Sequence, residues 1–241
     1  HSFDHVRFAN SGSEAVMIAL KAARARTGRP KIAKCEGSYH GSYDFAEVSL
    51  DSSPETWGNA DPKSVPYSAG TPQGVLDNVV VIPFNRTQEA ERILRANAAD
   101  LACVLVDPMP NRGGLIPAQR SFLEMLRRVT SECGMLLIFD EVISFRLGHA
   151  GAQGIYGVHP DLTTLAKIIG GGFPIGAIAG TADAMAVFDP RGGKPLAPHG
   201  GPFNANPVSM IAGTVAMELM TPDEFPRLNT LGQRIRDGIA D

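Results

Sequence analysis

Short apolar runs alternate with amphipathic stretches along most of this 241-residue chain. The runs lack strict polar alternation and several are rich in Val and Ile, which is typical of strands covered on both faces of a sheet. We predict seven such strands, over residues 6–9, 31–35, 79–83, 101–106, 135–139, 163–166 and 176–179.

Helical patterns separate these strands. A broad apolar side over residues 13–26 predicts one helix, and Gly134 stands where a helix C-cap glycine belongs. Two further helices follow from apolar residues spaced i, i+3 and i+4: Ala90, Ile93 and Leu94 in one, and Phe122, Met125, Leu126 and Val129 in the other. The alternation predicts an α/β fold with a mostly parallel central sheet and helices on both faces.

Two segments fall outside this alternation. Residues 51–74, rich in Ser, Pro and Gly, predict a long loop. The chain begins with His1 instead of Met, and it ends at Asp241 inside a helical pattern of Leu228, Leu231, Ile235 and Ile239. We therefore expect it to be a fragment of a longer polypeptide.

Composition narrows the class of protein. Hydrophobic residues make up 44% and charged residues 20% of the chain, which is typical of globular domains. A net charge of −3 argues against nucleic acid as a partner, and no apolar run approaches the ~20 residues that cross a bilayer. The three cysteines lie singly, so we expect reduced thiols in a cytoplasmic protein, with no disulfide and no metal site.

Reactive residues stand where several predicted strands end, which is where ligands bind in parallel sheets. The turn after the first strand gives Ser11 and Glu14 the spacing of a capping box, and Gly12 lets the backbone approach a ligand. Because a helix start offers free N–H groups and a positive dipole end, this turn can hold a phosphate. The alternative is a well-capped helix without a ligand.

Three more strand ends carry candidate chemistry. Asp140 ends an apolar run, and a buried carboxylate needs a cation or hydrogen-bond donors. Lys167 precedes three nearby glycines, and in apolar or cationic surroundings its amine becomes a nucleophile for aldehydes. Tyr39 and His40 follow the second strand, where an aromatic ring can stack on a flat cofactor. Taken singly, each also fits a surface or structural residue.

A phosphate site, a carboxylate, an aldehyde-reactive amine and a stacking ring are together what pyridoxal phosphate requires. The chain resembles the class III aminotransferases of the fold type I pyridoxal-phosphate superfamily, through four motifs in the family's order: NSGSEA at 10–15, YHG at 39–41, FDEV at 139–142 and LAKIIGGG at 165–172. This family includes glutamate-1-semialdehyde aminomutases and β-amino-acid aminotransferases. The likeness covers essentially the whole chain.

The resemblance implies catalytic roles for three residues. Lys167 would form an aldimine with the cofactor and then move the proton at the substrate's amine-bearing carbon. Asp140 would keep the pyridine nitrogen protonated, and Tyr39 would pack on one ring face. Val142 would pack on the other ring face, and Ser11, Gly12 and Ser13 would bind the phosphate. The residues that the resemblance implies for cofactor binding are thus Ser11, Gly12, Ser13, Tyr39, His40, Asp140, Val142 and Lys167.

The resemblance also implies an activity, which is transfer of an amino group from an amino acid or amine to a keto acid in a homodimer. Residues 1–222 would form the cofactor-binding large domain, and 223–241 the start of the linker helix to a C-terminal small domain that we expect to be incomplete. An intramolecular amino shift, as in the aminomutases, and a catalytically idle cofactor-binding fragment remain alternatives. A nucleotide-binding domain is disfavoured because neither G-x-G-x-x-G nor G-x-x-x-x-G-K-S/T occurs.

Two departures from the family pattern bear on the site. Pro202 stands where the family usually has a threonine that reaches the neighbouring subunit's phosphate, so a hydroxyl and an N–H are both lost. The sequence DPMPNR at 107–112 replaces a commoner Glu-Pro loop, which alters the contacts beside the cofactor. Arg112 and Arg146 are candidates for binding a substrate carboxylate.

Overall fold

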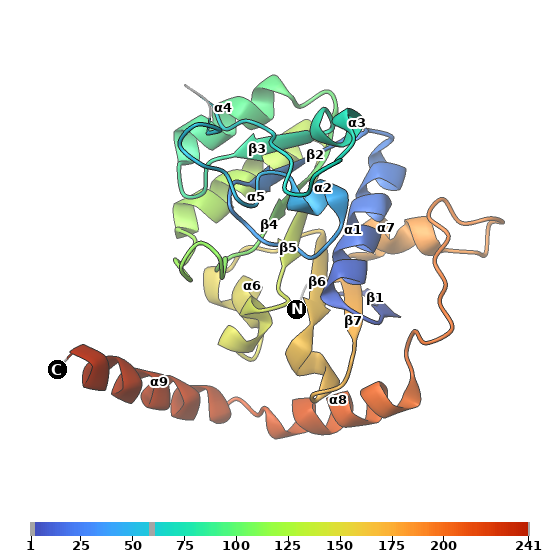
Figure 1. The fold of residues 1–241 in the computed structure, drawn as a ribbon. Helices are drawn as coiled ribbons and strands as arrows, with labels where there is room; N and C mark the ends of the chain where they lie inside the picture. Colours follow the sequence, from blue (N-terminus) through green and yellow to red (C-terminus); the bar gives the residue numbers. More distant parts are fainter. Residues whose placement is uncertain (1–2, 58–60, 241) are drawn as a thin grey trace.

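The computed structural model describes residues 3–57 and 61–240, and within them seven strands form one sheet. The strands are β1 (His5–Ala9), β2 (Lys31–Cys35), β3 (Val79–Ile82), β4 (Leu101–Val106), β5 (Leu136–Asp140), β6 (Leu162–Ala166) and β7 (Gly176–Gly180). Their order across the sheet is β1-β7-β6-β5-β4-β2-β3 (Figure 1). β7 runs antiparallel to both of its neighbours, and the four pairings that do not involve β7 are parallel. The mostly parallel sheet predicted from the sequence is confirmed.

Each of the seven predicted strands is present, with ends that shift by at most one residue. Met135 lies outside β5 because its N–H donates to the carbonyl of Thr130, 2.9 Å away, in the turn that ends the preceding helix. Asp140 is instead the last residue of β5. Pro83 lies beyond β3, as expected for a residue that has no N–H to donate to a neighbouring strand.

Helices cover both faces of the sheet. α1 (Gly12–Thr27) packs on one face, and α4 (Thr87–Ala96) and α5 (Arg120–Cys133) pack on the other. Because successive strand residues point to opposite faces, Leu105 of β4 joins the core under α1, while Val104 joins the core under α4 and α5. α5 ends at Gly134, whose φ of 64° is left-handed, so the predicted C-cap glycine is confirmed.

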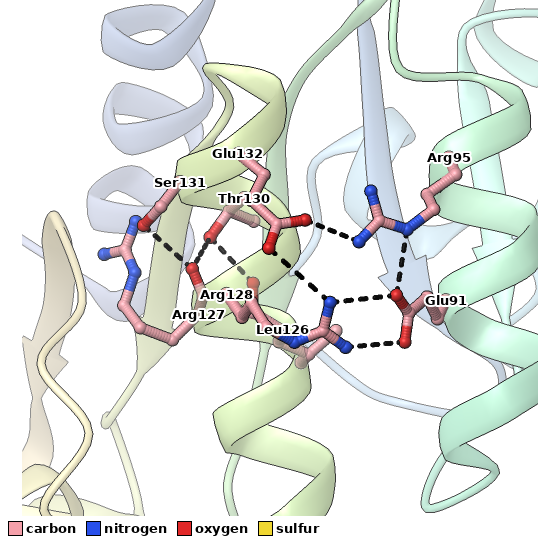
Figure 2. A network of polar contacts seen from close by, with 8 residues as sticks. All are labelled: Glu91, Arg95, Leu126, Arg127, Arg128, Thr130, Ser131 and Glu132. Atoms are coloured by element: carbon pink, nitrogen blue, oxygen red, sulfur yellow. Dashed lines mark hydrogen bonds and ion pairs between the residues drawn. The ribbon is translucent and has the colours of Figure 1, made fainter.

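A network of four charged side chains joins α4 and α5 on their solvent side (Figure 2). Glu91 lies 2.8 Å from Arg95 of its own helix and 2.7 Å from Arg128 of α5. Glu132 lies 2.5 Å from Arg95 and 3.7 Å from Arg128. Each arginine therefore contacts two carboxylates, one on each helix.

Short helical segments occupy the connections: α2 (Asp44–Glu47), α3 (Gln73–Leu76), the 3-10 turn η1 (Ser144–Leu147), α6 (Gly151–Tyr156), the 3-10 turn η2 (Lys167–Gly170), α7 (Ala182–Met185) and the 3-10 turn η3 (Ala186–Phe188). The loop predicted over 51–74 ends two residues early, because α3 begins at Gln73. Residues 58–60 of that loop lie outside the described part of the chain.

Two helices, α8 (Pro207–Leu219) and α9 (Glu224–Ala240), form an arm at the bottom of Figure 1. α8 packs closely on η2, since a Cβ on Gly213 would lie 2.1 Å from the carbonyl oxygen of Ile169. α9 contains no buried residue. The division of the chain into 1–222 and 223–241 falls in the turn between these helices and stays a prediction. None of the helices in the described residues is both long and apolar enough to cross a membrane.

Candidate functional site

A cavity of about 390 Å³ opens where β4, β5 and β6 end, beside the first turn of α1. This is the edge at which open parallel sheets bind their ligands. Its lining includes all eight residues expected from the sequence to bind a cofactor: Ser11, Gly12, Ser13, Tyr39, His40, Asp140, Val142 and Lys167. The fold therefore brings together side chains that are spread over more than 150 positions of the sequence.

The first turn of α1 forms one wall of the cavity. Ser11 is the N-cap, and its Oγ accepts a hydrogen bond from the N–H of Glu14 at 3.2 Å. The second half of the predicted capping box is wrong by one residue. The Glu14 carboxylate accepts from the N–H of Asn10 at 2.6 Å, because Asn10 also offers its side-chain amide to the same oxygen at 3.2 Å.

The start of α1 has the N–H groups and the dipole that can hold an anion. The N–H groups of Gly12 and Ser13 belong to the first helical turn, so they have no partner within the helix, and the helix dipole adds positive potential there. The loop after β2 comes close to this turn. The N–H of Ser42 donates to Ser13 Oγ at 3.1 Å, and a Cβ on Gly41 would lie only 2.4 Å from that oxygen.

Asp140 is only 4% exposed and accepts three hydrogen bonds. His40 Nδ1 lies 2.7 Å from Oδ2, while the N–H of Val142 and the hydroxyl of Thr164 each donate to Oδ1 at 3.1 Å. Hydrogen bonds to a carboxylate favour its ionised form. The site therefore presents a buried carboxyl group with three hydrogen-bond donors at the end of β5.

His40 is 2% exposed and lies behind this carboxylate. Burial lowers the pKa of His40, against the opposing effect of Asp140, so the neutral ring donates from Nδ1. Its Nε2 is buried and has no hydrogen-bond partner in the part of the chain that the structure describes. Lys34, which is fully buried and donates to the carbonyl of Val48 at 2.7 Å, adds a positive charge that also lowers the pKa of His40. The sequence placed His40 beside Tyr39 and gave no sign of its bond to Asp140.

Lys167 is the first residue of η2 and directly follows β6. Its side chain is exposed and lines the same cavity as Asp140. Its φ of 51° is left-handed, a conformation that costs a non-glycine residue about 1–2 kcal/mol and that is found at functional sites. Tyr39 is 38% exposed and also lines the cavity.

Asp107 also lines this cavity. It was indicated by the sequence only as part of the altered segment 107–112. It follows β4, is 3% exposed, and accepts from the N–H of Met109 at 2.9 Å. Burial raises the pKa of Asp107 to about 7, and the negative charge of Asp140 adds to this effect. The signal in the sequence was the same as for Asp140, a carboxyl that directly follows an apolar run.

Other candidates from the sequence lie elsewhere. Arg112 lies 3.8 Å from Asp51, and Arg146 lines a separate cavity beside α8 and α9. Pro202 lines a third cavity, of about 610 Å³, beside α1. Among the described residues, no arginine lines the cavity of about 390 Å³, and no group of three or more His, Cys, Asp or Glu is arranged to hold a metal ion.

Comparisons with known proteins agree with this geometry. The chain is 42% identical, over 242 residues, to a glutamate-1-semialdehyde 2,1-aminomutase of Caldivirga maquilingensis, a match that covers 100% of this chain and 54% of that protein. The structure of an omega-transaminase from Sphaerobacter thermophilus is 58% identical with a TM-score of 0.97, over 99% of this chain and 55% of the other. A transaminase structure with PLP bound is 49% identical with a TM-score of 0.91, over 98% of this chain and 54% of the other.

The chain thus spans about half the length of the proteins it matches. The family model for class-III aminotransferases matches residues 1–240, which is nearly the whole chain. With that match and the grouping of the four motifs around one cavity, the chain belongs to the class-III aminotransferases.

Proposed function

We propose that this chain binds pyridoxal phosphate in the cavity of about 390 Å³ and that the protein transfers an amino group from an amino acid or amine to a keto acid. The observation that carries the proposal is the meeting of Lys167 and Asp140, at the ends of adjacent strands, in one cavity with the start of α1. The cavity fits the cofactor. Its lining offers N–H groups for a phosphate and a buried carboxyl group for a protonated ring nitrogen.

When bound, pyridoxal phosphate supplies an aldehyde that combines with amines and a ring that accepts electrons. The residues that would hold it are Ser11, Gly12, Ser13, Tyr39, His40, Asp140, Val142 and Lys167. Asp140 would face the ring nitrogen and favour its protonated form, with its carboxyl group held by three hydrogen-bond donors. The amine of Lys167 would hold the cofactor at its aldehyde carbon, and it would also carry the proton at the substrate's amine-bearing carbon.

A second candidate is an intramolecular amino shift, because the relative from Caldivirga maquilingensis is named an aminomutase. The two functions use the same site and differ in whether a second substrate accepts the amino group. Transfer between molecules is favoured by the 58% identity to an omega-transaminase, against 42% to the aminomutase. Absorbance changes of the cofactor with separately added amine donors and keto acids separate the two. No change with any donor would support a catalytically idle cofactor-binding fragment.

The homodimer and the cytoplasmic location expected from the sequence belong to the same proposal. The segment around Pro202, which the resemblance directs toward a neighbouring subunit, lies outside the cofactor cavity of its own chain. Sedimentation of the purified chain with and without cofactor tests the predicted dimer.

Borohydride trapping tests the cofactor site. The chain is loaded with pyridoxal phosphate, reduced, denatured and dialysed, and its mass is measured. We expect a covalent adduct in the wild type and in the control Lys194→Ala, which removes an exposed lysine outside the cavity, and none in Lys167→Ala. An adduct that persists in Lys167→Ala rejects the assignment of Lys167, and a wild type without adduct rejects the proposed cofactor site.

A further inference from the structure

Three adjacent strands lead into ionisable residues that line one cavity. Asp107 follows β4, Asp140 ends β5, and Lys167 follows β6. Two carboxyls therefore share this cavity with one lysine amine, and the charge of Asp140 opposes ionisation of Asp107. In such a pair a proton goes to the carboxyl whose ionised form is less well stabilised.

The hydrogen bonds decide which carboxyl takes the proton. Both residues are almost fully buried, at 3% exposed for Asp107 and 4% for Asp140. Asp140 accepts from three donors, one of them the ring of His40, whereas the one donor to Asp107 among the described residues is the N–H of Met109. This difference in hydrogen bonding favours the proton on Asp107.

Charges on the neighbouring strand ends also affect the pKa of Asp107. Asp140 and Glu141 at the end of β5 raise the pKa of Asp107, and Lys167 at the end of β6 lowers it. On β2, burial raises the pKa of the Cys35 thiol to about 12, so this neighbour is neutral. Burial is the largest cause, and the resulting pKa of Asp107 is about 7.

We propose that Asp107 is the proton-holding carboxyl of this site and that it donates a hydrogen bond to an oxyanion of the bound ligand. That oxyanion is either the ring oxygen of the cofactor or the carboxylate of a substrate. The identity of the ligand rests on the proposed function, whereas the position of the proton does not. An ionised Asp107 repels the same oxygen, so ligand affinity falls as Asp107 loses its proton.

The position of the proton is tested without ligand. Carbon-13 NMR of chain labelled at aspartate carboxyl groups is recorded from pH 3 to pH 9 for the wild type, Asp107→Asn and the control Asp183→Asn, whose side chain is 71% exposed. We expect one carboxyl signal to titrate near pH 7 and to be absent only from Asp107→Asn. If the signal lost in Asp107→Asn titrates near pH 4 instead, the proposal is overturned.

The hydrogen bond is tested with pyridoxamine 5′-phosphate, which has no aldehyde and forms no bond to Lys167, and with N-(phosphopyridoxyl)-L-alanine, which adds a substrate carboxylate. Dissociation constants are measured at pH 6 and pH 8, and the ratio of the two constants is taken for each protein. The ligand ionises in the same way with every protein, so its own ionisation cancels when these ratios are compared. We expect the wild type to lose about tenfold more affinity across this range than Asp107→Asn, because one proton is linked to binding over about one pH unit above the pKa.

The outcomes separate the two sources of the oxyanion. A pH effect already present with pyridoxamine 5′-phosphate identifies the ring oxygen, and one that appears only with the alanine adduct identifies the substrate carboxylate. Equal ratios in the wild type and Asp107→Asn with both probes overturn the proposal. Failure of every variant to bind either probe at pH 6 instead rejects the proposed function, and the NMR titration still decides where the proton resides.

Discussion

His40 and Asp140 form a buried pair in which Nδ1 lies 2.7 Å from Oδ2, although the two residues are 100 positions apart in the sequence. The side chain of His40 is fully buried and that of Asp140 is 6% exposed. The bond connects the loop after β2 to the end of β5. These two strands are not neighbours, because β4 lies between them in the sheet. The bond therefore fixes the orientation of the carboxyl group.

We expect His40→Ala to lower the free energy of unfolding by about 1–3 kcal/mol, since Asp140 loses a donor in a buried position. Urea unfolding followed by circular dichroism measures the change. His159→Ala is the control, because His159 is exposed and its side chain is remote from the cavity, and its stability should equal that of the wild type. A His40→Ala protein as stable as this control contradicts the prediction.

Asp140→Asn should bind the cofactor and react slowly. The amide keeps the size of the side chain but carries no charge to hold a proton on the ring nitrogen, so we expect the half-reaction with an amine donor to slow by orders of magnitude. Stopped-flow absorbance measures this rate in protein that is fully loaded with cofactor. Near-normal rates would show that Asp140 does not face the ring nitrogen.

Lys167 has a left-handed backbone, so glycine should suit its position better than alanine does. We expect Lys167→Gly to be about 1 kcal/mol more stable than Lys167→Ala, because alanine keeps the steric cost of a positive φ. Both variants lack the amine, so thermal unfolding compares the backbone alone. Equal melting temperatures would mean that the positive φ relaxes when the lysine is removed.

Substitution of two glycines in the loop after β2 can distinguish the effect of backbone strain from that of a steric clash. Gly37 and Gly41 both have positive φ, 70° and 87°, but a Cβ on Gly37 meets nothing within 4 Å, while one on Gly41 would lie 2.4 Å from Ser13 Oγ. We expect Gly41→Ala to displace the start of α1 and to weaken binding of pyridoxal phosphate at least tenfold. Gly37→Ala should lower stability without this loss. Isothermal titration gives the affinities, and equal affinities in the two variants contradict the close approach.

The ion network between α4 and α5 should respond to salt and to acid (Figure 2). Hydrogen bonds from Arg128 and Arg95 lower the pKa of Glu91 to about 2 from an ordinary 4.5. Its contribution is therefore present above pH 4.5 and is lost as the pH falls towards 2. We expect Glu91→Gln to melt below the wild type at pH 7, with a difference that shrinks at pH 2 and in high salt. The control Glu124→Gln changes an exposed glutamate of α5 outside the network and should show no such dependence.

The sequence predicted the sheet well because continuous apolar runs mark strands that are covered on both faces, as at β4, where every residue is buried. α8 was missed although Asn206 caps it and Pro207 occupies its first turn. Its apolar residues lie all around the helix, so there was no one-sided periodicity to detect.

Strand ends identified the members of the site but not their bonds. Asp140 and Lys167 follow apolar runs, and that position brought both into one cavity. The pair of His40 with Asp140 depends on how far the loop after β2 folds back, which no local pattern encodes. The bond of Glu14 to Asn10 likewise depends on where the chain enters α1, one residue before the predicted partner.

No side chain of α9 is buried, and Leu231, Ile235 and Ile239 are 41%, 64% and 79% exposed. Such a helix gains little from tertiary packing, in which the ring of Phe225 near its start lies 6.3 Å from the ring of His149. Its 17 residues are barely enough to sustain a lone helix in water. Its amide hydrogens should therefore exchange with solvent through fraying, at free energies far below those that protect β4 and β5. Heat and denaturant should therefore unfold α9 separately from the sheet, although the two belong to one chain.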